Sequence, residues 1–221
     1  MMRALSVLEV RALGVLIEKS RTVPDSYPLS LNSLTLGCNQ KTGRDPVLNA
    51  TEDEAQAAAE ALKSLNLIFE STGSRVSRFE HNLGRALGLP SQSVAVLAVL
   101  MLRGPQTGPE LRANCERLHR FADQSSADGF LEELAERSTD KGGPLVVKLP
   151  RAPGAREPRW AHLLSGPIDL SAMPVATDSD SFVAVTEMAS LKAQQAVMQA
   201  ELIELRELVN RLCAELGVPP G

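Results

Sequence analysis

A nine-residue segment of this chain occurs twice, and this repeat constrains the fold more than any other feature. The first copy spans residues 75–83 (RVSRFEHNL) and the second spans residues 156–164 (REPRWAHLL). Both copies have arginine at the first and fourth positions, an aromatic residue at the fifth, histidine at the seventh and leucine at the ninth. The two copies are 81 residues apart, and the segment occurs only twice. This spacing is too long for a solenoid repeat and indicates one small domain used in tandem.

The composition favours small helical cores. Aromatic residues make up only 3% of the 221 residues, so leucine, valine and alanine must fill most of the interior. The formal net charge of −4 argues against a general affinity for nucleic acid, because phosphates are bound mainly by lysine and arginine. Contact with DNA would therefore need a local basic patch.

The first copy is expected to form three helices followed by a β-hairpin. Ser6 with Glu9, and Thr51 with Glu54, have the spacing of capping boxes, which open helices. Apolar residues at helical spacing follow both starts, and a short helix is expected between them. The expected elements are helices over about 6–20, 31–38 and 51–66 and strands over 67–69 and 76–83.

The second copy repeats this order. Its first helix starts at Ser91 and is almost entirely apolar over residues 94–102, which predicts burial on most sides. Thr107 with Glu110 forms the next capping box. A helix over 125–137 and strands over 145–149 and 159–164 complete the copy. The predicted fold class is mainly α with small β-hairpin wings (α+β): two tandem winged helix-turn-helix domains, residues 1–86 and 87–165.

The sequence of the last quarter of the chain predicts a linker and a dimerising helix. Residues 166–186 show no sustained period, and residues 187–217 follow a heptad pattern. Glu187 with Lys192 flanks the seam where a parallel partner would pair with it. We expect a parallel two-stranded coiled coil and a homodimer; the alternative is a helix folded back on its own winged helix. The expected dimerisation residues are Met188, Leu191, Met198, Leu202, Leu205, Val209, Leu212 and Leu216, with Gln195 as a polar core residue.

Cysteine usage and hydropathy predict a cytoplasmic protein without a membrane span. Cys38, Cys115 and Cys213 lie far apart and are odd in number, which suggests neither a zinc site nor a disulfide framework. Charged residues interrupt the N-terminus, and the longest apolar run, 94–102, is half a membrane span. We expect no cofactor and no metal.

The expected third helices conflict with the usual role of a winged helix, in which that helix enters the major groove. Both are acidic: Glu52, Asp53, Glu54 and Glu60 oppose one lysine in the first, and Asp123, Asp128, Glu132, Glu133 and Glu136 oppose one arginine in the second. Carboxylates near phosphates are repelled. If DNA is bound, the wings and loops must therefore make the contacts.

Several polar and basic residues are candidates for contact with DNA or another partner. They lie in the loop before the third helix, on the two wings and around the second helix of the second copy. The alternative is that these are ordinary surface charges and that the loop over 39–44 follows helix-terminus chemistry. The candidates are Asn39, Gln40, Lys41, Arg44, Arg75, Arg78, Arg112, Arg117, Arg120, Arg151, Arg156 and Arg159.

The remaining reactive side chains favour structural roles. His81 and His162 share a strand face with apolar residues, which is typical of a buried histidine satisfied by one hydrogen bond. Cys38 and Cys115 occupy equivalent apolar helix positions, where burial makes a thiol inert. No phosphate loop or nucleophile elbow is present, so we expect no enzymatic activity.

Three longer motifs resemble a known family. They are residues 38–46 (CNQKTGRDP), 102–111 (LRGPQTGPEL) and 149–157 (LPRAPGARE), the last followed by RWAHLL at 159–164. In this order they resemble the YceH-like family of bacterial proteins over about residues 4–166. The resemblance implies a tandem winged-helix fold in a bacterial cytoplasmic protein and carries over no functional residue.

The sequence thus predicts a non-catalytic, DNA-associated or transcription-regulatory protein that acts as a dimer. The alternative is a protein-interaction adaptor that uses its acidic third helices and wings and does not bind DNA.

The heptads generate one test. Light scattering of the full chain should give twice the monomer mass, and a truncation at Ser181 should give the monomer mass, because the heptad seam is expected to hold the dimer together. Equal monomer masses for both proteins would contradict the coiled coil.

Overall fold

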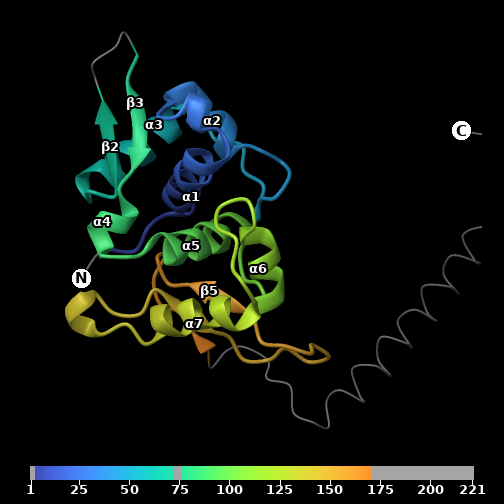
Figure 1. Cartoon of the computed structure of the whole chain (residues 1–221). Helices are drawn as coiled ribbons and strands as arrows, with labels where there is room; N and C mark the ends of the chain where they lie inside the picture. The colour runs from blue at the N-terminus through green and yellow to red at the C-terminus, as the bar shows by residue number, and fades with distance from the viewer. Residues whose placement is uncertain (1–2, 72–75, 171–221) are drawn as a thin grey trace, which may run out of the picture. The chain divides into compact units, whose positions relative to one another are not determined.

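The computed structural model describes residues 3–71 and 76–170 (Figure 1). The expected coiled coil over 187–217, with all of its seam residues, and most of the expected linker lie outside these residues. Contacts divide the chain into two units, residues 1–150 with 157–173, and residues 151–156 with 174–221. The two halves of the repeat, apart from residues 151–156, belong to the first unit.

The first half contains three helices, a short fourth helix and a three-stranded antiparallel sheet. Both expected capping boxes are present, so the helices after Ser6 and Thr51 begin where the sequence predicts. The strands have the order β1-β3-β2. The elements are α1 Val7–Thr22, the 3-10 turn η1 Pro24–Ser26, β1 Leu29–Ser30, α2 Leu31–Cys38, α3 Glu52–Ser64, β2 Ile68–Ser71, β3 Arg78–His81 and α4 Leu83–Leu87.

The second half has the same order of helices and strands. The capping box of Thr107 and Glu110 is present, with Pro109 in the first turn. Its strands pair antiparallel, with Val147 opposite Ala161. The elements are α5 Ser91–Arg103, α6 Gly108–Cys115, α7 Gln124–Ala135, η2 Thr139–Lys141, β4 Val146–Lys148 and β5 Trp160–His162. The fold is α+β, as predicted, and each half is consistent with a winged-helix-like domain.

Apart from shifted ends of helices and strands and the two 3-10 turns, two elements differ from the sequence prediction. The strand expected over 76–83 ends at His81, and Leu83 begins α4, which Gly88 closes with a φ of 63°. Leu83 is fully buried, as the alternation predicts, but it reaches the core from a helix. The second difference is β1, which has only two residues and therefore no periodic signal in the sequence.

The repeated segments have equivalent surroundings. Arg78 donates a hydrogen bond to the carbonyl oxygen of Pro28 (2.9 Å), and Arg159 donates one to that of Pro105 (2.8 Å). The aromatic residues that follow, Phe79 and Trp160, are both buried. Phe79 pairs with Leu29, and Trp160 pairs with Gln106; Leu29 and Gln106 each directly follow one of the two prolines. The two copies of the nine-residue segment therefore make equivalent local contacts.

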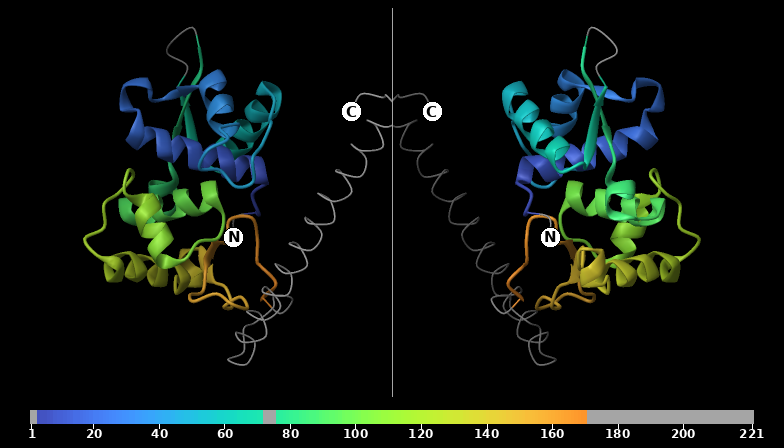
Figure 2. Two further views of the ribbon diagram at one scale, coloured as in Figure 1. Left: turned by 90° about the vertical axis from the view of Figure 1, so that its right-hand side faces the viewer. Right: turned by 90° about the vertical axis from the view of Figure 1, so that its left-hand side faces the viewer.

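The two halves share one core, centred on α1 and α5. These helices pack against each other at the boundary between the first half, blue to teal, and the second half, green to orange (Figures 1 and 2). Residues 9–17 of α1 and 93–102 of α5 are all buried. The approach is close at Gly14, where an added Cβ would lie 3.0 Å from the side chain of Leu102. No helix in the described part of the chain is long and apolar enough to span a membrane.

Candidate functional site

Arg44 is not a surface contact, which corrects the prediction from the sequence. Its side chain is only 1% exposed and forms a bidentate ion pair with Glu18 of α1, with distances of 3.1 and 2.6 Å. Burial acts to raise the pKa of Glu18, but the hydrogen bonds and charge of Arg44 outweigh it, so that pKa lies below its usual value. A guanidinium held in this way cannot reach a phosphate.

The rest of the loop over 39–46 is also anchored. Asn39 exchanges two side-chain hydrogen bonds with the backbone of Ala50, at 2.8 and 2.7 Å, and Gln40 bonds to the carbonyl of Thr42. The amide of Asp45 donates to the carbonyl of Leu102 at the end of α5 (2.9 Å). Of the four candidates in this loop, Lys41 is the one whose side chain is exposed. The contacts of Asn39, Gln40 and Arg44 therefore stabilise the loop itself, which agrees with the alternative that these residues have structural roles.

Arg11 is a buried arginine that the sequence analysis did not single out. It is 1% exposed, and its guanidinium donates to the carbonyls of Cys38 (3.0 Å) and Pro46 (2.5 Å), at the two ends of the loop. Burial, followed by the nearby charge of Arg44, lowers the pKa of Arg11. Its only signal in the sequence is its position within the otherwise apolar run of residues 10–17. Arg11 and Arg44 together fix the loop to α1.

The wing arginines are partly occupied by internal contacts. Arg78 donates a hydrogen bond to the carbonyl of Pro28. Arg159 donates one to the carbonyl of Pro105 and also forms an ion pair with Glu110 at 2.9 Å. Because about half of each side chain in the Arg159–Glu110 pair is exposed, the pair contributes little to stability. Arg75 lies outside the described residues.

The other predicted arginines are exposed, in two separate places. Arg151 and Arg156 flank a turn closed by a hydrogen bond from Ala155 to Ala152, in the second contact unit. Arg112 of α6 and Arg120 line one surface hollow with Phe121, and Arg117 lies between them in sequence. The structure thus brings Arg112 and Arg120 together.

The acidic character of the third helices is confirmed as an exposed feature. The carboxylate residues of α3 are exposed, and its single lysine, Lys63, forms an ion pair with Glu70 of β2 at 2.5 Å. In α7 and its C-cap, three glutamates are exposed and Asp128 is half-buried. Asp123, the N-cap of α7, is also exposed and accepts a hydrogen bond from the amide of Ser126. The exposed carboxylate residues are Glu52, Asp53, Glu54 and Glu60 on α3 and Glu132, Glu133 and Glu136 on α7.

The histidines and cysteines of the repeat have structural roles. Burial lowers the pKa of both wing histidines, that of His162 to about 4, so both are neutral at pH 7. Burial raises the pKa of Cys38 to about 11 and that of Cys115 to about 12, which leaves both thiols protonated and unreactive. Cys213 lies outside the described residues. Among residues 3–71 and 76–170, no three His, Cys, Asp or Glu side chains are placed to hold a metal ion.

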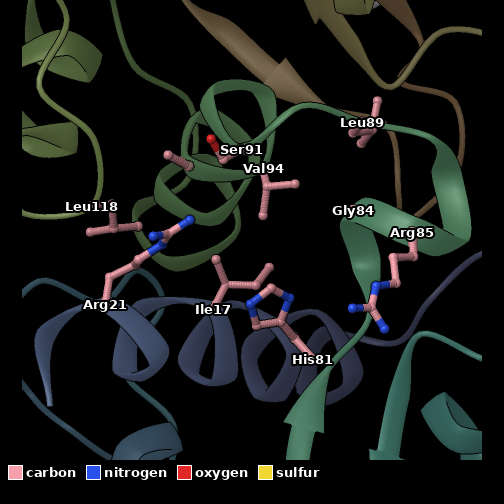
Figure 3. A pocket seen from close by; sticks show the side chains of 10 residues that line it. Ile17, Arg21, His81, Gly84, Arg85, Leu89, Ser91, Val94 and Leu118 are labelled. Carbon is pink, nitrogen blue, oxygen red and sulfur yellow. The ribbon is translucent and has the colours of Figure 1, made fainter. Parts of the chain in front are cut away.

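A cavity of about 420 Å³ lies within the first unit, and the sequence did not predict it. Its wall combines residues from α1, the end of β3, α4, α5 and the segment after α6 (Figure 3). Because these segments are distant in sequence, no local motif marks the cavity. The lining residues are Ile17, Arg21, His81, Gly84, Arg85, Leu89, Ser91, Val94, Ala95 and Leu118.

Two neighbouring residues of the loop test its role. Arg44→Gln should lower the free energy of unfolding by about 2–4 kcal/mol, because it leaves the carboxylate of Glu18 partly buried without its partner. The matched Lys41→Gln variant should change it by less than about 0.5 kcal/mol. Because the pKa of Glu18 is lowered in the folded state, the gap between wild type and Arg44→Gln should shrink as the pH falls below 4.5. Urea titrations at several pH values measure this, and equal effects of the two variants would contradict the clamp.

Comparison with known proteins places the chain among bacterial relatives of nearly the same length. A UPF0502 protein of Methylibium petroleiphilum is 59% identical over 218 residues, covering 98% of this chain and 92% of that protein. Those of Leptothrix cholodnii and Acidovorax sp. are 57% and 56% identical, covering 99% and 98% of this chain and 98% and 96% of theirs. Residues 5–155 match the family described as "Protein of unknown function, DUF480". The chain therefore belongs to this DUF480/UPF0502 family of bacterial proteins, in agreement with the YceH-like resemblance of its motifs.

Proposed function

We propose that the protein is a non-catalytic tandem winged-helix protein that binds another protein through the exposed carboxylates of α3 and α7. In a winged helix these two elements hold the position of the helix that enters DNA. The observation that carries the proposal is their exposed negative charge, which the one lysine of α3 does not offset because it is paired with Glu70. A DNA duplex would repel such a surface.

The intramolecular contacts of the arginines also favour a protein partner over DNA. The sequence made DNA the leading candidate partner because arginines recur on the wings and in the loop. In the structure, Arg44 is buried, and Arg159 forms an ion pair with Glu110. Fewer free cations therefore remain to bind phosphates, and the interaction adaptor becomes the better supported function.

The chemistry of the partner follows from the charge of the helices. Two acidic helix surfaces on one unit are complementary to a basic protein surface, and complementary charges raise association rates and specificity. Such contacts weaken with salt because exposed charges are screened. The proposed partner is accordingly a protein with a patch rich in lysine and arginine.

DNA remains the second candidate because of one specific feature. Arg112, Arg117 and Arg120 are exposed, and the hollow that Arg112 and Arg120 share is lined by one carboxylate residue, Glu116. This group could hold phosphates while α7 faces away from the duplex.

The protein is further proposed to act as a homodimer in the cytoplasm. Dimerisation through residues 187–217 rests on the heptad pattern alone. The alignments with the relatives cover nearly the whole chain, so they extend past residue 155, where the match to the family ends.

Three variants separate the two candidates. The first replaces Glu132, Glu133 and Glu136 with glutamine; its control replaces the exposed Glu116, Asp140 and Glu157, which gives the same change in net charge. The third replaces Arg112, Arg117 and Arg120 with glutamine. Tagged full-length proteins are incubated with nuclease-treated bacterial lysate, and binding to random duplex DNA is followed by fluorescence anisotropy at several salt concentrations.

We expect wild type and the control to retain the same proteins. The α7 variant should retain about tenfold less of them or lower still, which corresponds to about 1.4 kcal/mol of binding free energy. Equal retention by the α7 variant would contradict the proposal. DNA binding that weakens steeply with salt and is abolished in the arginine variant would establish the second candidate instead.

A further inference from the structure

The cavity of about 420 Å³ described above has the size of a small-molecule site, which is roughly 300–1,000 Å³. It joins the two halves of the repeat, because α1 and α4 form one part of its wall and α5 another. All of its lining residues belong to the first contact unit. It lies apart from the acidic residues of α3 and α7, which contribute nothing to its lining.

The wall is apolar in the middle and cationic at both ends. Ile17, Val94 and Ala95 are buried residues of α1 and α5 that form its apolar part. Figure 3 shows Arg21 and Arg85 on opposite sides of Ile17, Val94 and His81. The lining includes no carboxylate; Glu80 lines an adjoining hollow instead.

The guanidinium charges of these two arginines are not compensated by a contact within the described part of the chain. Within residues 3–71 and 76–170, neither Arg21 nor Arg85 forms a hydrogen bond or ion pair through its guanidinium. By contrast, Arg3 and Arg44 both form bidentate contacts with glutamates. A guanidinium without a partner beside an apolar wall is suited to a carboxylate ligand, which it can bind with two parallel hydrogen bonds.

His81 contributes surface but no charge. The hydroxyl of Ser20 donates its single proton to the carbonyl of Ile17 (2.8 Å), so its contact with Nε2 of His81 (3.3 Å) requires Nε2 to carry the imidazole proton. Burial, and then the charge of Arg21, lowers the pKa of this imidazole, which keeps it neutral at pH 7. The positive charge of the cavity therefore belongs to Arg21 and Arg85.

We propose that the cavity binds a small dicarboxylate whose apolar middle packs on Ile17 and Val94 while its two carboxylates meet Arg21 and Arg85. The site is independent of the proposed protein partner and of the acidic helices. Because the ligand would contact both halves of the repeat, its binding stabilises the folded unit by an amount that grows with the logarithm of the ligand concentration above the dissociation constant.

Suberate is the probe for this test, and calorimetry with the full chain is the measurement. Octanoate, with one carboxylate, and 1,8-octanediol, with none, have the same carbon chain. We expect suberate to bind at least about tenfold more tightly than octanoate, which corresponds to about 1.4 kcal/mol, and octanediol to bind more weakly than either, because each carboxylate removed takes away one guanidinium–carboxylate contact. Arg21→Gln and Arg85→Gln should each reduce the affinity for suberate to that of octanoate.

The control is the Arg112→Gln, Arg117→Gln double variant, which removes exposed arginines outside the cavity and should bind suberate as wild type does. Arg21 and Arg85 are exposed, so their replacement leaves the core intact, and circular dichroism checks the fold. Equal affinities for suberate and octanediol, equal affinities for suberate and octanoate, or unchanged binding in the Arg21 and Arg85 variants would each overturn the proposal.

Discussion

The packing of α1 against α5 is the interaction on which the rest of the structure depends. Each helix is the first of its half, and each is buried over most of its length. A helix that is apolar on nearly all sides cannot remain stable in a small isolated domain, because one face would meet water. Gly14, with Leu102 close above it, allows the two helices to approach. The two copies of the repeat therefore complete each other's core.

This shared core explains why charged residues occur inside the unit. The loop over 39–46 connects α2 to α3 and also contacts the end of α5, so its polar backbone is partly enclosed. Buried backbone carbonyls need donors, and Arg11 supplies them to Cys38 and Pro46, while Arg44 is neutralised by Glu18. Such groups stabilise the fold only as complete sets, because a single missing partner leaves a buried charge or carbonyl unsatisfied.

Local sequence patterns predicted most of the helices, and long-range contacts account for what they missed. The boxes at Ser6, Thr51 and Thr107 fix helix starts through bonds only three residues apart, and these are visible in the sequence. The partner of an arginine is not visible in this way. Arg44 pairs with a residue 26 positions earlier, and the contact of Arg159 with Glu110 spans 49 positions. The cavity was missed for the same reason, since its wall draws on distant segments.

The central claim is that α1 and α5 make the two halves one cooperative unit, and the single tryptophan of the chain tests it directly. Trp160 lies in the second half, whereas Leu13 is fully buried in α1 of the first. Leu13→Ala should cost about 2–5 kcal/mol. Urea unfolding followed by Trp160 fluorescence and by far-ultraviolet circular dichroism should then shift equally and as one transition. An unshifted fluorescence transition, beside a destabilised dichroism transition, would contradict the shared core.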